Sequence, residues 1–204
     1  MRRLLFALLA LSLGAALAQS TIRIGLAEDP DILDPDLART YVGRIVFTSL
    51  CDKLFDITPQ AEIVPQLVTD YSVSADGLAL DLTVREDVTF HDGTPLDAAA
   101  VKYNLERSKT LPGSMRASEI AQVTSVDVTG PYSVRLNLSQ PFSPLIAQLA
   151  DRAGMMISPT AAEAAGEQFG TSPVCSGPYK FVQRVAQDRI VLEKYAGYWN
   201  AAAF

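Results

Sequence analysis

Few side chains in this sequence could carry out covalent or metal chemistry. His91 is the only histidine, and it stands beside an Asp92-Gly93 turn. A histidine that binds a metal or acts as a base needs partners, but the sequence has no His-Glu-x-x-His, no Cys-x-x-Cys and no second histidine. The Gly-x-Ser-x-Gly nucleophile elbow and the phosphate-binding Gly-x-x-x-x-Gly-Lys motif are also missing. We therefore predict a structural or solvated His91, and a protein that binds rather than catalyses.

Four aspartates gather near the start of the chain, and their carboxylates could bind a cation. They are Asp29, Asp31, Asp34 and Asp36. Their spacing lacks the central glycine and the terminal glutamate of a calcium-binding loop. We therefore predict solvated loop carboxylates, no metal site and no cofactor.

The N-terminus has the pattern of a secretory signal peptide. Two arginines follow Met1, an apolar stretch runs to Leu17, and small residues end it at Ala18. The apolar stretch is shorter than the roughly 20 residues of a membrane-spanning helix, which favours a cleaved signal over residues 1–18 rather than a membrane anchor. We predict an exported protein, periplasmic or extracellular, whose mature part begins at Gln19.

The charge balance excludes one class of partner. The sequence carries 17 basic and 23 acidic residues, with a formal net charge of −6. Binding to nucleic acid requires clustered basic charge, so we expect no nucleic-acid partner. The length suits one large or two small domains with a sizeable core.

Two cysteines, Cys51 and Cys175, lie far apart in the sequence. An even number of cysteines in an exported protein indicates a disulfide. The alternative is two separate buried thiols. We favour the disulfide because export places the chain in an oxidising compartment.

The hydrophobic pattern predicts an α+β fold with mixed strands and helices. Apolar alternation predicts strands at 21–25, 78–84, 123–128, 134–138, 179–185 and 189–195. Helical spacing and breakers predict helices at 41–54, 98–108, 144–150 and 159–166. Asp97, Ser143 and Ser158 stand where N-caps are expected. The two prolines of 29–35 exclude a helix there.

Five stretches, in order, match motifs of one protein family. DPDILDP at 29–35 is similar to an Asp-x-x-x-Leu-Asp-Pro loop, and 63–78 contains IVPQL followed by YSVSADGL. LTVREDVTFHDGTP begins the most specific stretch, 82–107; PVCSGPYKF at 173–181 and DRIVLEK with a Tyr-Trp pair in 188–199 complete the set. The sequence thus resembles the family-5 solute-binding proteins, which supply peptides, glutathione, nickel complexes and some sugars to ABC importers.

The resemblance implies a periplasmic-binding-protein class II-like fold, of which this sequence holds the first lobe and a small β-rich subdomain. Residues 19–204 would form the N-terminal lobe, with 19–45 and 155–204 in its main part and 46–154 as an inserted subdomain. Members of the family are more than twice as long and close two lobes around a cleft. With the second lobe absent, we expect half of a solute cleft.

The resemblance also implies which residues meet a solute. Peptide-binding relatives use positions just after the Leu-Asp-Pro loop, here Arg39, Thr40 and Tyr41. Arg39 could pair with a carboxylate, and Tyr41 could stack or donate a hydrogen bond. The alternative is a surface arginine and a tyrosine that merely begins a helix. By position, Tyr103 and Arg107 are expected to be packing and surface residues.

A second implied ligand segment is Cys175, Ser176 and Gly177. Small residues there would let a ligand backbone approach. The family usually has glycine where this sequence has Cys175, and a bridge to Cys51 would tie the early helix to this segment.

The function implied is that of the substrate-binding component of an ABC importer. Its solute would be a peptide, glutathione or a nickel complex, and its partners a membrane permease and the ATPase subunits, with the binding protein acting as a monomer. Two alternatives remain: an extracytoplasmic hydrolase on a similar scaffold, and a truncated interaction protein that binds no solute.

Overall fold

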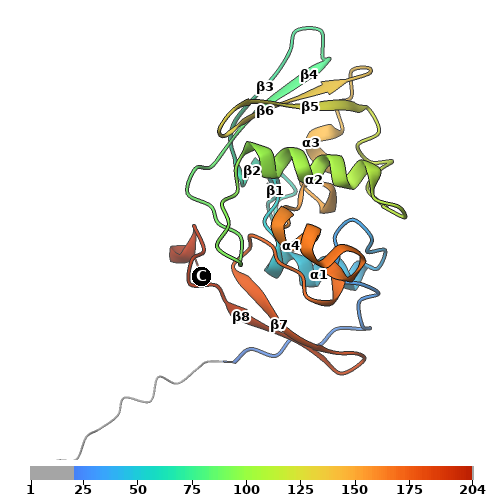
Figure 1. The fold of residues 1–204 in the computed structure, drawn as a ribbon, viewed down its shortest axis with the longest axis vertical. Helices are drawn as coiled ribbons and strands as arrows, with labels where there is room; N and C mark the ends of the chain where they lie inside the picture. Colours follow the sequence, from blue (N-terminus) through green and yellow to red (C-terminus); the bar gives the residue numbers. More distant parts are fainter. Residues whose placement is uncertain (1–20, 204) are drawn as a thin grey trace, which may run out of the picture.

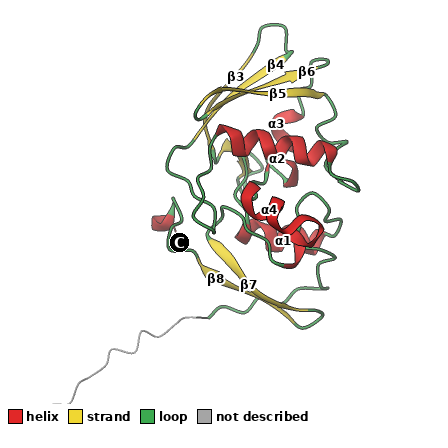
Figure 2. Ribbon diagram, viewed as in Figure 1, coloured by secondary structure: helices red, strands yellow, loops and turns green. Residues whose placement is uncertain are grey.

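A four-stranded sheet forms one end of the molecule and a two-stranded sheet the other, with helices between them (Figures 1 and 2). This computed structural model describes residues 21–203, so the predicted signal peptide over 1–18 lies outside the described residues. The helices are α1 (Tyr41–Leu50), α2 (Ala98–Thr110), α3 (Leu145–Gln148) and α4 (Pro159–Ala165), with 3-10 turns η1 (Arg152–Gly154), η2 (Gly166–Thr171) and η3 (Ala201–Ala203). The strands are β1 (Phe55–Ile57), β2 (Ile63–Pro65), β3 (Val68–Val73), β4 (Ala79–Val84), β5 (Val123–Gly130), β6 (Ser133–Leu138), β7 (Tyr179–Val185) and β8 (Arg189–Lys194).

The four-stranded sheet is antiparallel, in the order β3-β4-β6-β5. Leu80 and Leu82 of β4 and Leu136 of β6 are buried on its inner face. On the outer face, Asp81 pairs with Arg135 of β6 through two hydrogen bonds of 2.7 and 2.8 Å. This alternation confirms the predicted strand at 78–84, and the predicted strands at 123–128 and 134–138 correspond to the paired strands β5 and β6.

Helix α2 lies against the inner face of this sheet (Figure 1). The Asp97 carboxylate accepts a hydrogen bond from the Ala100 N–H at 2.9 Å, which satisfies an otherwise free donor of the first turn. Val101 and Leu105 are fully buried in the core. The predicted helix and its cap are confirmed, and the helix continues to Thr110.

Helices α1 and α4 form the middle of the molecule, above the β7–β8 hairpin (Figure 2). Thr40 caps α1 by accepting from Gly43 N–H, and Ser158 caps α4 by accepting from Ala161 N–H. Helix α1 ends at Leu50, earlier than predicted, because Cys51 is extended and the next residues pair with 154–156.

Two predictions about local structure were wrong. Residues 21–25 form no strand: Ile22 and Ile24 are 82% and 74% exposed, and among the described residues the segment has no strand partner to satisfy its backbone. Ser143 does not cap α3, which begins at Leu145 with Pro144 at the N-cap position and no side-chain hydrogen bond.

The buried side chains form two hydrophobic clusters. One surrounds the four-stranded sheet and α2, and the other surrounds α1, η2 and the Cys51–Cys175 pair. The chain crosses between them twice, and the crossings are hydrogen-bonded to each other: Leu54 N–H donates to Gly154 O at 2.9 Å, and Met156 N–H donates to Asp52 O at 3.1 Å. The predicted division of the chain at 46–154 stays a prediction.

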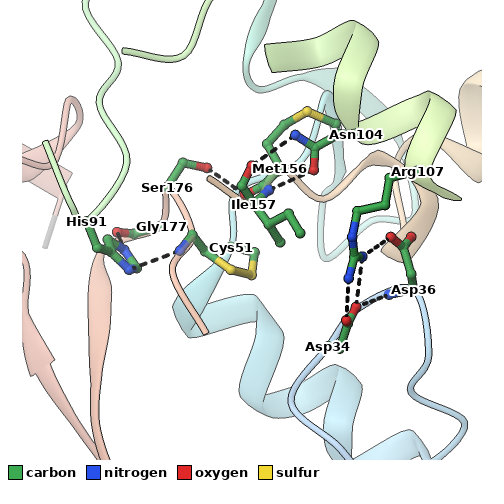
Figure 3. Close-up of a disulfide and its surroundings, with 11 residues drawn as sticks. Asp34, Asp36, Cys51, His91, Asn104, Arg107, Met156, Ile157, Ser176 and Gly177 are labelled. Atoms are coloured by element: carbon green, nitrogen blue, oxygen red, sulfur yellow. Dashed lines mark hydrogen bonds and ion pairs between the residues drawn. A yellow bond between two sulfur atoms is a disulfide. The ribbon is translucent and has the colours of Figure 1, made fainter. Parts of the chain in front are cut away.

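Asn104 ties α2 to the second crossing. Its side-chain amide donates to Ile157 O and its oxygen accepts from Ile157 N–H, each at 2.9 Å (Figure 3). The amide also donates to Ala100 O at 2.9 Å. A buried amide with its donors and acceptor occupied fixes the position of α2 relative to the lower part of the molecule. Within 21–203, none of the helices has the length and apolar character required to cross a membrane.

Candidate functional site

The loop that precedes α1 is anchored by a buried ion-pair cluster. Arg107 of α2 donates to the Asp34 carboxylate at 2.6 Å and also binds the Asp36 carboxylate (Figure 3). Ser108 Oγ donates to Asp36 at 2.5 Å. Burial raises the pKa of Asp36, against the opposing effects of Ser108 and Arg107. The predictions of solvated carboxylates at Asp34 and Asp36, and of a surface Arg107, were wrong because each side supplies the charge that lets the other be buried.

The next segment, 38–40, is held along both of its edges by side chains. On one edge the Asp31 carboxylate accepts from Arg39 N–H at 2.9 Å and from Thr40 Oγ1 at 3.1 Å. On the other edge Arg152 donates to the Ala38 and Thr40 carbonyls at 3.0 and 3.4 Å. The backbone of this segment is therefore fixed before α1 begins.

Arg39 and Tyr41 point away from the core at this point. Both are exposed, with Tyr41 at 70%. Among the described residues, the Arg39 side chain makes no ion pair, and the first turn of α1 contains no acidic residue. The guanidinium and the N–H groups of the helix start together present positive charge to solvent.

The second predicted ligand segment is buried instead. Cys51 and Cys175 form a disulfide with a Cα–Cα distance of 4.8 Å, and Cys175 and Ser176 are fully buried. Gly177 N–H donates to Leu50 O at 2.8 Å, and a Cβ on Gly177 would lie 2.6 Å from that carbonyl. The close approach that needs a glycine here comes from the end of α1. Side-chain contact between Cys175 or Ser176 and a solute is therefore at odds with their burial.

His91 holds the same segment in place. Its Nδ1 accepts from Cys175 N–H at 3.3 Å, which leaves the proton on Nε2 to donate to Gly177 O at 3.0 Å (Figure 3). Burial lowers the pKa of His91, which favours this neutral form. The structural interpretation of His91 agrees with these contacts.

The two predicted ligand segments do not form one site. The first lies at the start of α1 and the second packs on its last residue, Leu50. A ten-residue helix is about 15 Å long. Of the six predicted ligand residues, the structure leaves Arg39 and Tyr41 accessible, with Thr40 partly buried as the cap between them.

Asp52, in the first crossing between the two hydrophobic clusters, is a buried carboxylate that the sequence analysis did not predict. Asp52, 2% exposed, accepts from Trp199 Nε1 at 2.7 Å, from Gln66 Nε2 at 3.1 Å and from Tyr198 OH at 3.2 Å. Burial raises its pKa to about 6. Tyr198 and Trp199 belong to one of the five family motifs, but the sequence around Asp52 does not indicate that it binds them. The Arg85 guanidinium covers the Trp199 ring at 3.9 Å.

The sequence was compared with models of known protein families. Residues 62–203 match the family model described as "Bacterial extracellular solute-binding proteins, family 5 Middle". The chain belongs to family 5 of the bacterial extracellular solute-binding proteins. The family resemblance read from the five motifs is confirmed.

Curated and solved members of family 5 extend the comparison. The glutathione-binding protein GsiB of Salmonella paratyphi A is 34% identical over 91% of this chain. Two solved structures are also similar: AgaA from A. tumefaciens R10 in complex with agropinic acid, at 26% identity and a TM-score of 0.77, and NikA from Brucella suis in complex with Fe(III)-EDTA, at 27% and 0.75. Each of these two alignments covers 85% of this chain.

The family-5 relatives are much longer than this sequence. The chain spans 36% of GsiB and 35% of the AgaA and NikA chains. The α+β fold described above therefore corresponds to part of a family-5 protein, a partial lobe, as the resemblance implied.

Proposed function

We propose that this protein is the substrate-binding component of an ABC importer. It captures a small solute outside the cytoplasm and delivers it to a membrane permease that is driven by ATPase subunits. The observation that carries the proposal is the family match over 62–203. The curated relatives it matches are named for binding a solute and not for catalysis, which favours a non-enzyme over the hydrolase alternative.

The solute class follows from the accessible residues at the start of α1. Among residues 21–203, Arg39 presents a guanidinium without an ion-pair partner, Tyr41 presents an exposed phenol, and the start of α1 adds the positive end of a helix. A carboxylate complements all three. Peptides and glutathione carry free carboxylates, and GsiB is named for binding glutathione. We therefore put glutathione or a short peptide ahead of a nickel complex.

The remaining features of the proposal concern place and assembly. The signal-like segment 1–18 would direct export and be removed, so the protein would act in the periplasm or outside the cell. It would work as a monomer that docks on the permease when loaded. The rest of the cleft would close over the solute by a hinge motion.

Thermal unfolding of the purified chain, with and without solutes, tests the proposal. Reduced glutathione, a set of di- and tripeptides and a nickel–histidine complex are the probes. We expect an upward shift in melting temperature with glutathione or a peptide, because binding to the folded state stabilises it. Replacing Arg39 with glutamine should weaken binding about tenfold through loss of a charge-assisted pair.

The matched control is Arg189→Gln, which removes another exposed arginine from strand β8. It should leave the shift unchanged. A cooperative melt that no solute moves would contradict solute binding by this chain and support the interaction-protein alternative. Cleavage of an added peptide would support the hydrolase alternative.

A further inference from the structure

The segment 38–40 behaves as an isolated strand whose neighbours are side chains. Thr40 is extended, with φ −74° and ψ 150°. In an extended chain, alternate residues direct their backbone groups to opposite edges. The Ala38 and Thr40 carbonyls accordingly meet Arg152, and the intervening Arg39 N–H meets Asp31. Side chains alternate too: Ala38 is fully buried and Arg39 is exposed.

A single nitrogen of Arg152 binds both carbonyls on one edge of the segment, those of Ala38 and Thr40. Nη1 donates to both carbonyls, and it carries two hydrogens, one for each acceptor. The neighbouring residue, Asp151, pairs with Arg44 in the first turn of α1 at 2.9 Å. The turn at 151–152 therefore contacts the chain before and after the helix start, but only Arg152 bonds the backbone of 38–40.

We propose that Arg152 is a positioning residue for solute binding: by donating to the Ala38 and Thr40 carbonyls it fixes the strand-like segment 38–40 that presents Arg39 and Tyr41. The effect of Arg152 on solute binding rests on the proposed function. The effect of Arg152 on the conformation of 38–40 rests only on the hydrogen bonds described above. Arg152 itself does not touch the solute; it lowers the cost of ordering the residues that do.

The test compares three variants of the purified chain. Arg152→Met keeps much of the side-chain length and removes the donors. Arg152→Lys keeps the charge and a donor group. Arg44→Met is the matched control, because it removes a neighbouring cation and its ion pair with Asp151 while leaving the carbonyl edge intact.

The first readout is amide hydrogen exchange, followed by NMR. In Arg152→Met, the Arg39 and Gly43 amides, which donate to Asp31 and Thr40, should exchange about tenfold faster. Val101 in α2 should be unaffected. Arg152→Lys should restore part of the protection, and Arg44→Met should leave it near the wild-type value. Equal exchange in wild type and Arg152→Met, or an equal rise in Arg44→Met, would overturn the proposal.

The second readout is the Kd for reduced glutathione, measured by calorimetry. Arg152→Met should weaken it about tenfold, with part of the loss recovered in Arg152→Lys. If the wild type binds no glutathione, the proposed solute is wrong, and the exchange data alone then decide whether Arg152 positions the segment. Faster exchange at Arg39 with an unchanged Kd would refute the link between Arg152 and the solute.

Discussion

Asp52 is the clearest case of a single residue whose surroundings control its charge. Three donors converge on it, from Gln66, Tyr198 and Trp199. They favour the ionised form, but burial acts in the opposite direction and is the largest effect, so the pKa rises to about 6. The nearby charges are Asp56, which raises this pKa further, and Lys53, which lowers it.

This shift predicts a pH dependence of stability. The pKa of Asp52 is higher in the folded protein than its ordinary value of 3.8. The folded state therefore binds the proton more tightly, and the stabilisation is present below pH 4 and lost as pH rises through 6. Relative to Asp52→Asn, the wild type should lose on the order of 2 kcal/mol of unfolding free energy between those pH values.

Denaturant unfolding at several pH values measures this difference. Trp199 is the only tryptophan in the sequence and bonds Asp52 directly, so its fluorescence follows the transition. Subtracting the Asp52→Asn curve removes the contributions of other titrating groups. Parallel stability curves for the two proteins from pH 4 to 7 would show that Asp52 titrates normally.

At the scale of elements, the contact between α1 and the Cys175–Gly177 segment depends on a missing side chain. A Cβ at Gly177 would lie 2.6 Å from the Leu50 carbonyl, which is backbone and cannot rotate away. Gly177→Ala should therefore force α1 and this segment apart. We expect a loss on the order of 2 kcal/mol in unfolding free energy.

The matched control is Gly25→Ala. Gly25 is exposed, and nothing lies within 4 Å of its added Cβ. Its unfolding free energy should stay within about 0.5 kcal/mol of the wild type. Similar denaturation midpoints for Gly177→Ala and Gly25→Ala would mean that α1 can move away from residue 177 without a loss of unfolding free energy.

Most helices and strands could be predicted because their determinants are local. Asp97 caps α2 three residues from its partner, and the alternation in β4 is visible over a few residues. The strand predicted at 21–25 failed because alternation states which face would be buried, and not whether a neighbouring strand exists. Strands β1 and β2 are too short to give a periodic signal.

The candidate site was harder to predict because its contacts are distant in sequence. Arg107 meets Asp34 and Asp36 across more than 70 residues, and Arg152 meets Ala38 across 114. The sequence around each of these residues contains no pattern that indicates its distant partner. The family motifs directed the prediction to 39–41, whose ligand role stays a prediction, and they could not show that Cys175 and Ser176 are buried.

At the scale of the whole molecule, the disulfide closes most of the chain into a loop. Cys51 and Cys175 are 124 residues apart. A cross-link of this span restricts the unfolded chain, and the chain-entropy model gives about 4–5 kcal/mol. Because His91 and the Gly177–Leu50 hydrogen bond hold the same segment, the folded geometry should survive its removal.

Two measurements check the disulfide. Thiol titration of the denatured, unreduced protein should find no free cysteine, and two free thiols would contradict the bridge. The Cys51→Ala, Cys175→Ala double variant should unfold at a lower denaturant concentration, with the His91 ring resonances unchanged. A shift in those resonances would mean that the disulfide also shapes the native segment.

The hydrogen-bonded crossings between the two clusters have a consequence for the design of chimaeras. The chain leaves for the four-stranded sheet at Leu54 and returns at Gly154, and these two residues are bonded to each other. Because the two ends of this segment adjoin, we expect that a related segment with similarly spaced ends can replace it without a long linker. Lys53 and Met155 pair across the crossings, and we therefore expect them to be suitable junctions for chimaeras with other members of the family.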